Sequence, residues 1–155
     1  MLIKHFQMLA RYNTLANSKL YEVCSQLSDT ERKRIRPAFF KSIHATLNHI
    51  IVGDRIWLTR FEGKQIPSTG LDTILYEDFD QLRKARTAQD EQIKTFAAGL
   101  TEEFLTKTIE YQNNSGKICT APIDLLVAHF FNHQTHHRGQ IHDMMHALHK
   151  SPRYL

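Results

Sequence analysis

Histidine can bind metals and transfer protons, and the histidines of this chain are concentrated near its C-terminus. The chain has ten histidines, and seven of them lie between His129 and His149. His133 and His137 are four residues apart, which on an α-helix places them one turn apart on the same face. Two imidazoles at this spacing can bind one metal ion as a chelating pair, as in zinc enzymes with H-x-x-x-H helices.

The direction of each side chain selects His133 and His137 from the other histidines of this segment. At about 100° per residue, both fall within the apolar stripe that Phe130 and Met144 help to form. The other five lie at the edge of that stripe or point away from it: His129, His136, His142, His146 and His149. Protonation of an inward-facing imidazole is unfavourable, and both ring nitrogens need partners. We therefore expect the pair to bind a metal rather than to be two hydrogen-bonded core residues.

A metal ion needs at least a third ligand, and residues 42–61 offer His44 and His49. Both lie to the side of the apolar stripe of that segment, so direction alone does not choose between them. His44 shares its flank with Asn48 and Arg55, which predicts that its side chain faces solvent. His49 has small neighbours such as Gly53, which predicts partial burial with space for an ion, so His49 is the better candidate.

Four stretches of helical periodicity must position these residues, namely 3–27, 42–61, 78–100 and 122–149. Asp78 is a suitable N-cap and Pro122 a favoured residue at a helix start. Residues 108–120 alternate around Asn-Ser-Gly and predict a short β-hairpin between the third and fourth helices. Residues 28–40 and 62–75 are expected to be loops. The fold class is all-α in a single domain over residues 1–155, and the long connections allow a bundle with or without a crossover.

Several polar residues fall where apolar ones are expected. Asn13 and Asn17 lie on the apolar stripe of the first helix and Asp54 on that of the second, so all three need buried partners. They are expected to form one network that either holds the helices together or supports the site. Arg138 points away from the stripe, toward solvent or a second subunit, and Gln140 lies where it could orient a ligand.

Composition excludes several classes of protein. The formal charge is only +4, and the basic run Arg32–Arg36 lacks interleaved aromatic residues, so it predicts a solvated connection rather than a nucleic-acid contact. No apolar run approaches the roughly 18 residues that span a bilayer, and the N-terminus lacks a secretory signal. The cytoplasm is the expected compartment, with Cys24 and Cys119 as free thiols.

Recognised catalytic motifs are absent from the sequence. It has no Glu-x-x-His of di-iron bundles, no H-E-x-x-H of zincin proteases, no glycine-rich phosphate loop and no G-x-S-x-G elbow. No catalytic residue outside the histidines can be named.

Three stretches of the sequence resemble the DinB family of damage-inducible bacterial proteins. They are residues 12–17 (YNTLAN), 42–58 (SIHATLNHIIVGDRIWL) and 132–141 (NHQTHHRGQI), and the resemblance extends over nearly the whole chain. It implies a four-helix bundle with up-down-down-up topology and metal ligands at His49, His133 and His137. It also implies a homodimer. Relatives of the family include thiol-dependent transferases and an isomerase.

Three neutral imidazoles suit Zn, Ni, Fe or Cu, and three protein ligands leave positions open for water or substrate. The leading hypothesis is a metal-dependent enzyme that transfers a low-molecular-weight thiol to a small-molecule electrophile. The alternative is a metal-binding stress protein without catalysis, in which the ion stabilises the fold. DNA binding is a weaker third hypothesis, because no helix has a basic face. No membrane partner is expected.

Overall fold

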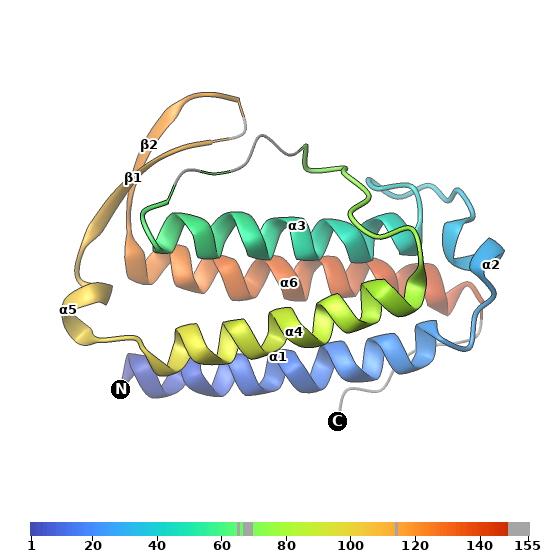
Figure 1. The fold of residues 1–155 in the computed structure, drawn as a ribbon, viewed down its shortest axis with the longest axis horizontal. Helices are drawn as coiled ribbons and strands as arrows, with labels where there is room; N and C mark the ends of the chain where they lie inside the picture. Colours follow the sequence, from blue (N-terminus) through green and yellow to red (C-terminus); the bar gives the residue numbers. More distant parts are fainter. Residues whose placement is uncertain (65, 67–69, 114, 149–155) are drawn as a thin grey trace.

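The computed structural model describes residues 1–64, 66, 70–113 and 115–148, and this part of the chain is mostly helical. It contains six helices and one two-stranded antiparallel sheet (Figure 1). The helices are α1 (Leu2–Cys24), α2 (Asp29–Lys33), α3 (Ile43–Phe61), α4 (Phe79–Ala98), α5 (Glu102–Leu105) and α6 (Ile123–His146), and the strands are β1 (Thr108–Gln112) and β2 (Ile118–Pro122).

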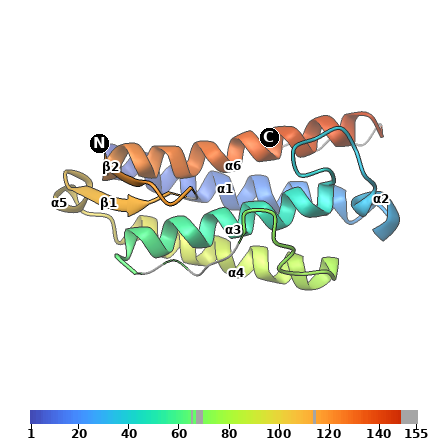
Figure 2. The same cartoon turned by 90° about the horizontal axis from the view of Figure 1, so that it is seen from above.

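The four long helices lie side by side (Figures 1 and 2). The colour order along each ribbon shows that α1 and α6 run in one direction and α3 and α4 in the other. α1 packs against α4 and α6, and α3 packs against the same two helices. Each long helix therefore has two long neighbours, and the faces that they share form the interior.

The predicted helices agree with the observed ones to within a few residues at each end, and local capping explains their starts. The Ser42 hydroxyl accepts a hydrogen bond from the Ala45 amide, and the Asp78 carboxylate accepts one from the Gln81 amide. Each bond satisfies a backbone N–H that has no partner within its helix. Pro122 occupies the N-cap position of α6, and the predicted end of that helix at His149 lies outside the described residues.

The predicted hairpin is also present. β1 and β2 pair in antiparallel register, with Tyr111 opposite Cys119. Gly116, in the connection between them, has a φ of 82°, a conformation that glycine adopts without strain. The hairpin leads directly into α6 and packs against its start.

Two short helices were missed, because periodicity needs a window longer than the five residues of α2 or the four of α5. The expectation that the basic run is a solvated connection was wrong for Arg32. This side chain is buried, its guanidinium lies over the Phe79 ring at 4.1 Å, and it donates to the carbonyls of Cys24 and Leu27.

The apolar core consists of two clusters at opposite ends of the long helices. One includes Trp57 and Phe130 near the hairpin, and the other includes Leu20 and Met145 near α2. Seven buried polar residues lie between these clusters along the four helices, and we call them the polar layer: Asn13, Asn17, Asp54, Arg86, Asp90, Gln134 and Arg138. The fold thus has a polar middle between two apolar ends.

Cys24 is buried, Cys119 is partly exposed, and both are free thiols as predicted. Among the described helices, none is both long enough and apolar enough to cross a membrane.

Candidate metal centre

The rings of His49, His133 and His137 converge between α3 and α6. The Nε2 atom of His49 lies 3.2 Å from that of His133 and 3.1 Å from that of His137, and the last two are 3.1 Å apart. The three Nε2 atoms therefore form a nearly equilateral triangle. Within the described residues, these histidines are the group whose ligand atoms are close enough to hold one ion.

A glycine on α3 makes room for this triangle. A Cβ atom at Gly53 would lie 2.7 Å from Cε1 of His133, closer than real side chains approach. His49 is one turn before Gly53 on the same helix. Glycine here lets the His133 ring lie against the backbone of α3, where its Nε2 reaches His49.

Hydrogen bonds on the outer edges of two rings fix their orientation. Nδ1 of His49 donates to the backbone carbonyl of Leu71 at 2.8 Å, and Nδ1 of His137 donates to Oε1 of Gln140 at 2.8 Å. With the proton on Nδ1, the Nε2 lone pair is free to point into the triangle. Nδ1 of His133 is buried and has no hydrogen-bond partner among the residues that the structure describes.

Phe40, from the segment that precedes α3, covers one side of the site. Its ring stacks on His49 at a centroid distance of 3.8 Å and meets His137 edge-on at 5.6 Å. Phe40 is itself buried. An aromatic wall at this position excludes water from one side of the histidine rings.

The surroundings keep all three histidines neutral. Burial, reinforced by the neighbouring histidines, lowers the pKa of His133 to about 3. Burial likewise lowers the pKa of His137 to about 4, although its hydrogen bond to Gln140 acts in the opposite direction. The pKa of His49 is lowered by the same cause. Neutral imidazole is the form that binds metals.

The arrangement fits a transition-metal ion. With metal–nitrogen bonds of about 2.05 Å, two ligand nitrogens would lie about 2.9 Å apart at a right angle and about 3.3 Å apart at the tetrahedral angle. The observed separations of 3.1–3.2 Å fall between these values. His49 and His137 both donate through Nδ1, so their Nε2 lone pairs face each other at 3.1 Å and repel unless a cation lies near them. An ion explains this contact, and hydrogen bonding between these two rings does not.

The other candidate histidines lie outside the triangle. His44 was expected to face solvent but is 2% exposed, and its Nε2 is 2.9 Å from the carbonyl of Tyr76. The prediction failed because residues 71–76 pack over that flank of α3, an interaction that helix periodicity does not contain. His129 is exposed and lies edge-on to Trp57 at 5.2 Å, and His136 is exposed beside Gln140, so both are edge residues as predicted.

The predicted network of Asn13, Asn17 and Asp54 exists, although its two central members were missed. Arg86 pairs with Asp54 at 2.6 Å and with Asp90 at 2.9 Å. Asp90 in turn accepts hydrogen bonds from Asn17 at 2.9 Å and from Asn13 at 3.3 Å. Arg86 and Asp90 fall on the stripe of α4 between Leu82 and Ile93, and that spacing was the signal that could have identified them.

The expectation that Arg138 points to solvent or to a second subunit was wrong. It is 4% exposed and donates to the side-chain oxygens of Asn13 and Asn17. A long arginine side chain can reach across to a neighbouring helix even when its Cα lies at the flank of the apolar stripe.

Comparison with known proteins confirms the resemblance to the DinB family. The sequence model of the DinB family matches residues 1–153. The chain is also similar to Protein DinB of Bacillus subtilis (strain 168), with 26% identity over 147 residues that cover 88% of this chain and 82% of that protein.

Proposed function

We propose that this chain, which belongs to the DinB family, binds one divalent transition-metal ion through Nε2 of His49, His133 and His137. The observation that carries the proposal is the triangle of three neutral imidazole nitrogens at 3.1–3.2 Å. Zn, Ni and Fe all suit this ligand set.

Three protein ligands leave positions open for a water or a substrate, as in catalytic rather than structural zinc sites. When bound, the ion would lower the pKa of a coordinated water or thiol toward neutrality. The chain's own groups have other tasks. Leu71 and Gln140 hold two imidazoles in the required tautomer, and Phe40 keeps water from one side.

The finer proposal is an enzyme of the thiol S-transferase type. The open ligand set supports it, together with the resemblance to a family whose relatives include thiol-dependent transferases. The partners would be a low-molecular-weight thiol and a small electrophile, with no nucleic acid or membrane. We further propose an up-down-down-up four-helix bundle that acts as a cytoplasmic homodimer.

A second candidate is a metal-binding stress protein without catalysis. One observation favours it: the ligands come from two separate helices, so an ion would join α3 to α6 and stabilise their packing. Unfolding with and without a chelator, combined with a screen of thiols and electrophiles, separates the two candidates. A large loss of stability on chelation without any turnover would favour the second.

Metal analysis of protein purified without a nickel column tests the binding proposal. We expect about one zinc, nickel or iron ion per chain, and a loss of affinity of more than about 100-fold in His137→Ala, because a lost ligand should cost more than a lost supporting hydrogen bond. His146→Ala, an exposed histidine on the same helix, is the matched control and should bind normally. Equal affinity in the two variants would contradict the proposal.

A further inference from the structure

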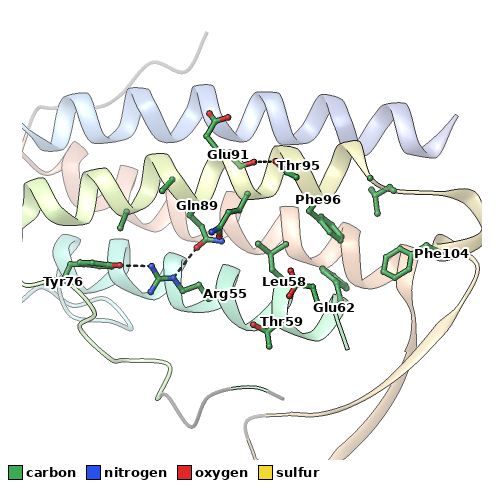
Figure 3. Close-up of a pocket in the computed structure, with 16 residues that line it drawn as sticks. Arg55, Leu58, Thr59, Glu62, Tyr76, Gln89, Glu91, Thr95, Phe96 and Phe104 are labelled. Carbon is green, nitrogen blue, oxygen red and sulfur yellow. Dashed lines mark hydrogen bonds between the residues drawn. The ribbon is translucent and has the colours of Figure 1, made fainter. Parts of the chain in front are cut away.

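A large groove lies between α3 and α4, on a different side of α3 from the histidines. It has a volume of about 1050 Å³ and a lining that mixes polar and apolar residues. Figure 3 shows Tyr76 and Arg55 at one end, Gln89 near the middle, and Phe96 and Phe104 toward the other end. Arg55 and Glu62 are about two turns apart, so the groove follows α3 for about 10 Å.

Neutral groups hold Arg55 in place at the polar end. Its Nε donates to Oε1 of Gln89 at 3.3 Å, and its Nη2 donates to the Tyr76 hydroxyl at 2.8 Å. The structure gives Arg55 no carboxylate partner among the described residues. The guanidinium is therefore positioned without being neutralised, and the Tyr76 hydroxyl, which accepts from Arg55, keeps its own proton available to a ligand.

The two acidic residues of the groove do not compensate Arg55, because each has a lysine of its own. Glu62 pairs with Lys64 at 2.6 Å, and Glu91 pairs with Lys94 at 2.7 Å. Within the part of the groove that the structure describes, one positive charge remains. A single negative charge on a ligand would balance it.

The opposite end can receive an apolar group. Leu58, Phe96 and Phe104 line it and are only partly buried, and the Phe96 ring stacks on Phe61 at 5.1 Å. Partly exposed aromatic side chains toward one end of the groove and a hydrogen-bonded guanidinium at the other match a molecule with an apolar body and an anionic head, because each part removes water from a complementary surface.

We propose that the groove between α3 and α4 binds a small amphipathic carboxylate, with the carboxylate on Arg55 and Tyr76 and the hydrocarbon part against Leu58, Phe96 and Phe104. The site is separate from the metal centre, since Arg55 faces α4 whereas His49 faces α6. One segment touches both: Leu71 accepts from His49, and Tyr76 binds Arg55. Ligand binding in the groove therefore needs no metal. The ligand would nevertheless contact Tyr76, in the same segment as Leu71, which forms a hydrogen bond with His49.

Titration of the full chain with octanoate, followed by calorimetry and by amide chemical shifts, tests this proposal. We expect saturable binding with shifts along α3 and α4, and weaker binding of both acetate, which lacks the tail, and octanol, which lacks the charge. Arg55→Gln should weaken octanoate binding about tenfold, the loss of one charge-assisted contact. Lys84→Gln, an exposed cation on α4 outside the groove, should leave it unchanged.

Other outcomes would overturn the proposal. If Arg55→Gln binds octanoate as well as the original chain does, the polar end is not the anion site. If chelation abolishes binding and the shifts cluster around His49, the carboxylate binds the metal centre instead. If Arg55→Gln changes the sedimentation coefficient and octanoate causes no shifts, a second copy of the chain occupies the groove. Since Arg55 is exposed, its variant should melt normally, and the comparison stays valid.

Discussion

The polar layer is buried, and the three histidines are buried or partly buried, but the two sets differ in how their charges and lone pairs are matched. In the polar layer, two carboxylates (Asp54 and Asp90) lie with two guanidinium groups (Arg86 and Arg138), so the charges balance. In the histidine triangle, the Nε2 atoms of three neutral imidazoles lie 3.1–3.2 Å apart, and those of His49 and His137 present lone pairs, because both rings donate through Nδ1. The first set balances its charges within the chain, whereas the second has donor atoms that a cation from outside the chain could bind.

The largest expected effect comes from breaking the charge balance of the polar layer. Arg86→Ala leaves Asp54 and Asp90 buried without their main cation, which should lower the free energy of unfolding by about 3–5 kcal/mol. Urea denaturation at neutral pH measures this. Arg83→Ala, on the exposed side of the same helix, is the control and should stay within about 0.5 kcal/mol. A small effect of Arg86→Ala would mean that water compensates the carboxylates.

The two regions should respond to acid in opposite directions. Burial lowers the pKa of His133 from 6.5 to about 3, so the folded state binds fewer protons than the unfolded one. The contribution of His133 to the free energy of unfolding is therefore complete above about pH 6.5 and is lost as the pH falls toward 3. Burial raises the pKa of Asp54 from 3.8 to about 6, so its penalty is relieved as the pH falls through 6.

The free energy of unfolding of the protein, measured with a chelator present to remove metal, should therefore fall by about 2 kcal/mol between about pH 7 and pH 4.5 through His133 alone. His133→Gln should flatten this dependence, and Asp54→Asn should make it steeper because the opposing contribution disappears. If His133→Gln leaves the slope unchanged, the ring is already accessible to protons in the folded state.

Removing an outer hydrogen bond should weaken the metal centre without unfolding the chain. Gln140→Leu takes away the acceptor for Nδ1 of His137, which should reduce metal affinity about 10- to 100-fold. Competition with a chelating dye measures the affinity. Asn132→Leu, an exposed position on the same helix, is the control, and an equal loss there would mean that the hydrogen bond is unimportant.

The smallest effects come from two helical glycines. Gly139→Ala, with open space around its Cα, should raise the free energy of unfolding by about 0.5–1 kcal/mol through helix propensity, with no change in metal affinity. Gly53→Ala gains the same propensity but pushes on the His133 ring, so it should lose about tenfold in metal affinity. The two variants should diverge in metal affinity, and parallel behaviour would show that the ring can move aside.

The sequence predicted the site most securely where a single helix determines the geometry. His133 and His137 follow from a spacing of four and an apolar flank, and both inferences depend only on α6. The choice of His49 depends on how α3 packs against α6, and there the resemblance added what periodicity lacked. The position of His44 was mistaken because a connecting segment covers it, and the partners of Arg138 lie on α1, more than a hundred residues away in sequence.

Trp57, the one tryptophan of the chain, has a practical consequence for these experiments. Its indole meets the His129 ring at 5.2 Å, and that ring lies 6.1 Å from His133. The molecule thus carries a native fluorophore two rings away from the proposed ion. The fluorescence of Trp57 should be quenched when a paramagnetic ion such as Ni²⁺ or Cu²⁺ binds, and much less when Zn²⁺ binds. Metal binding can therefore be titrated optically without a label.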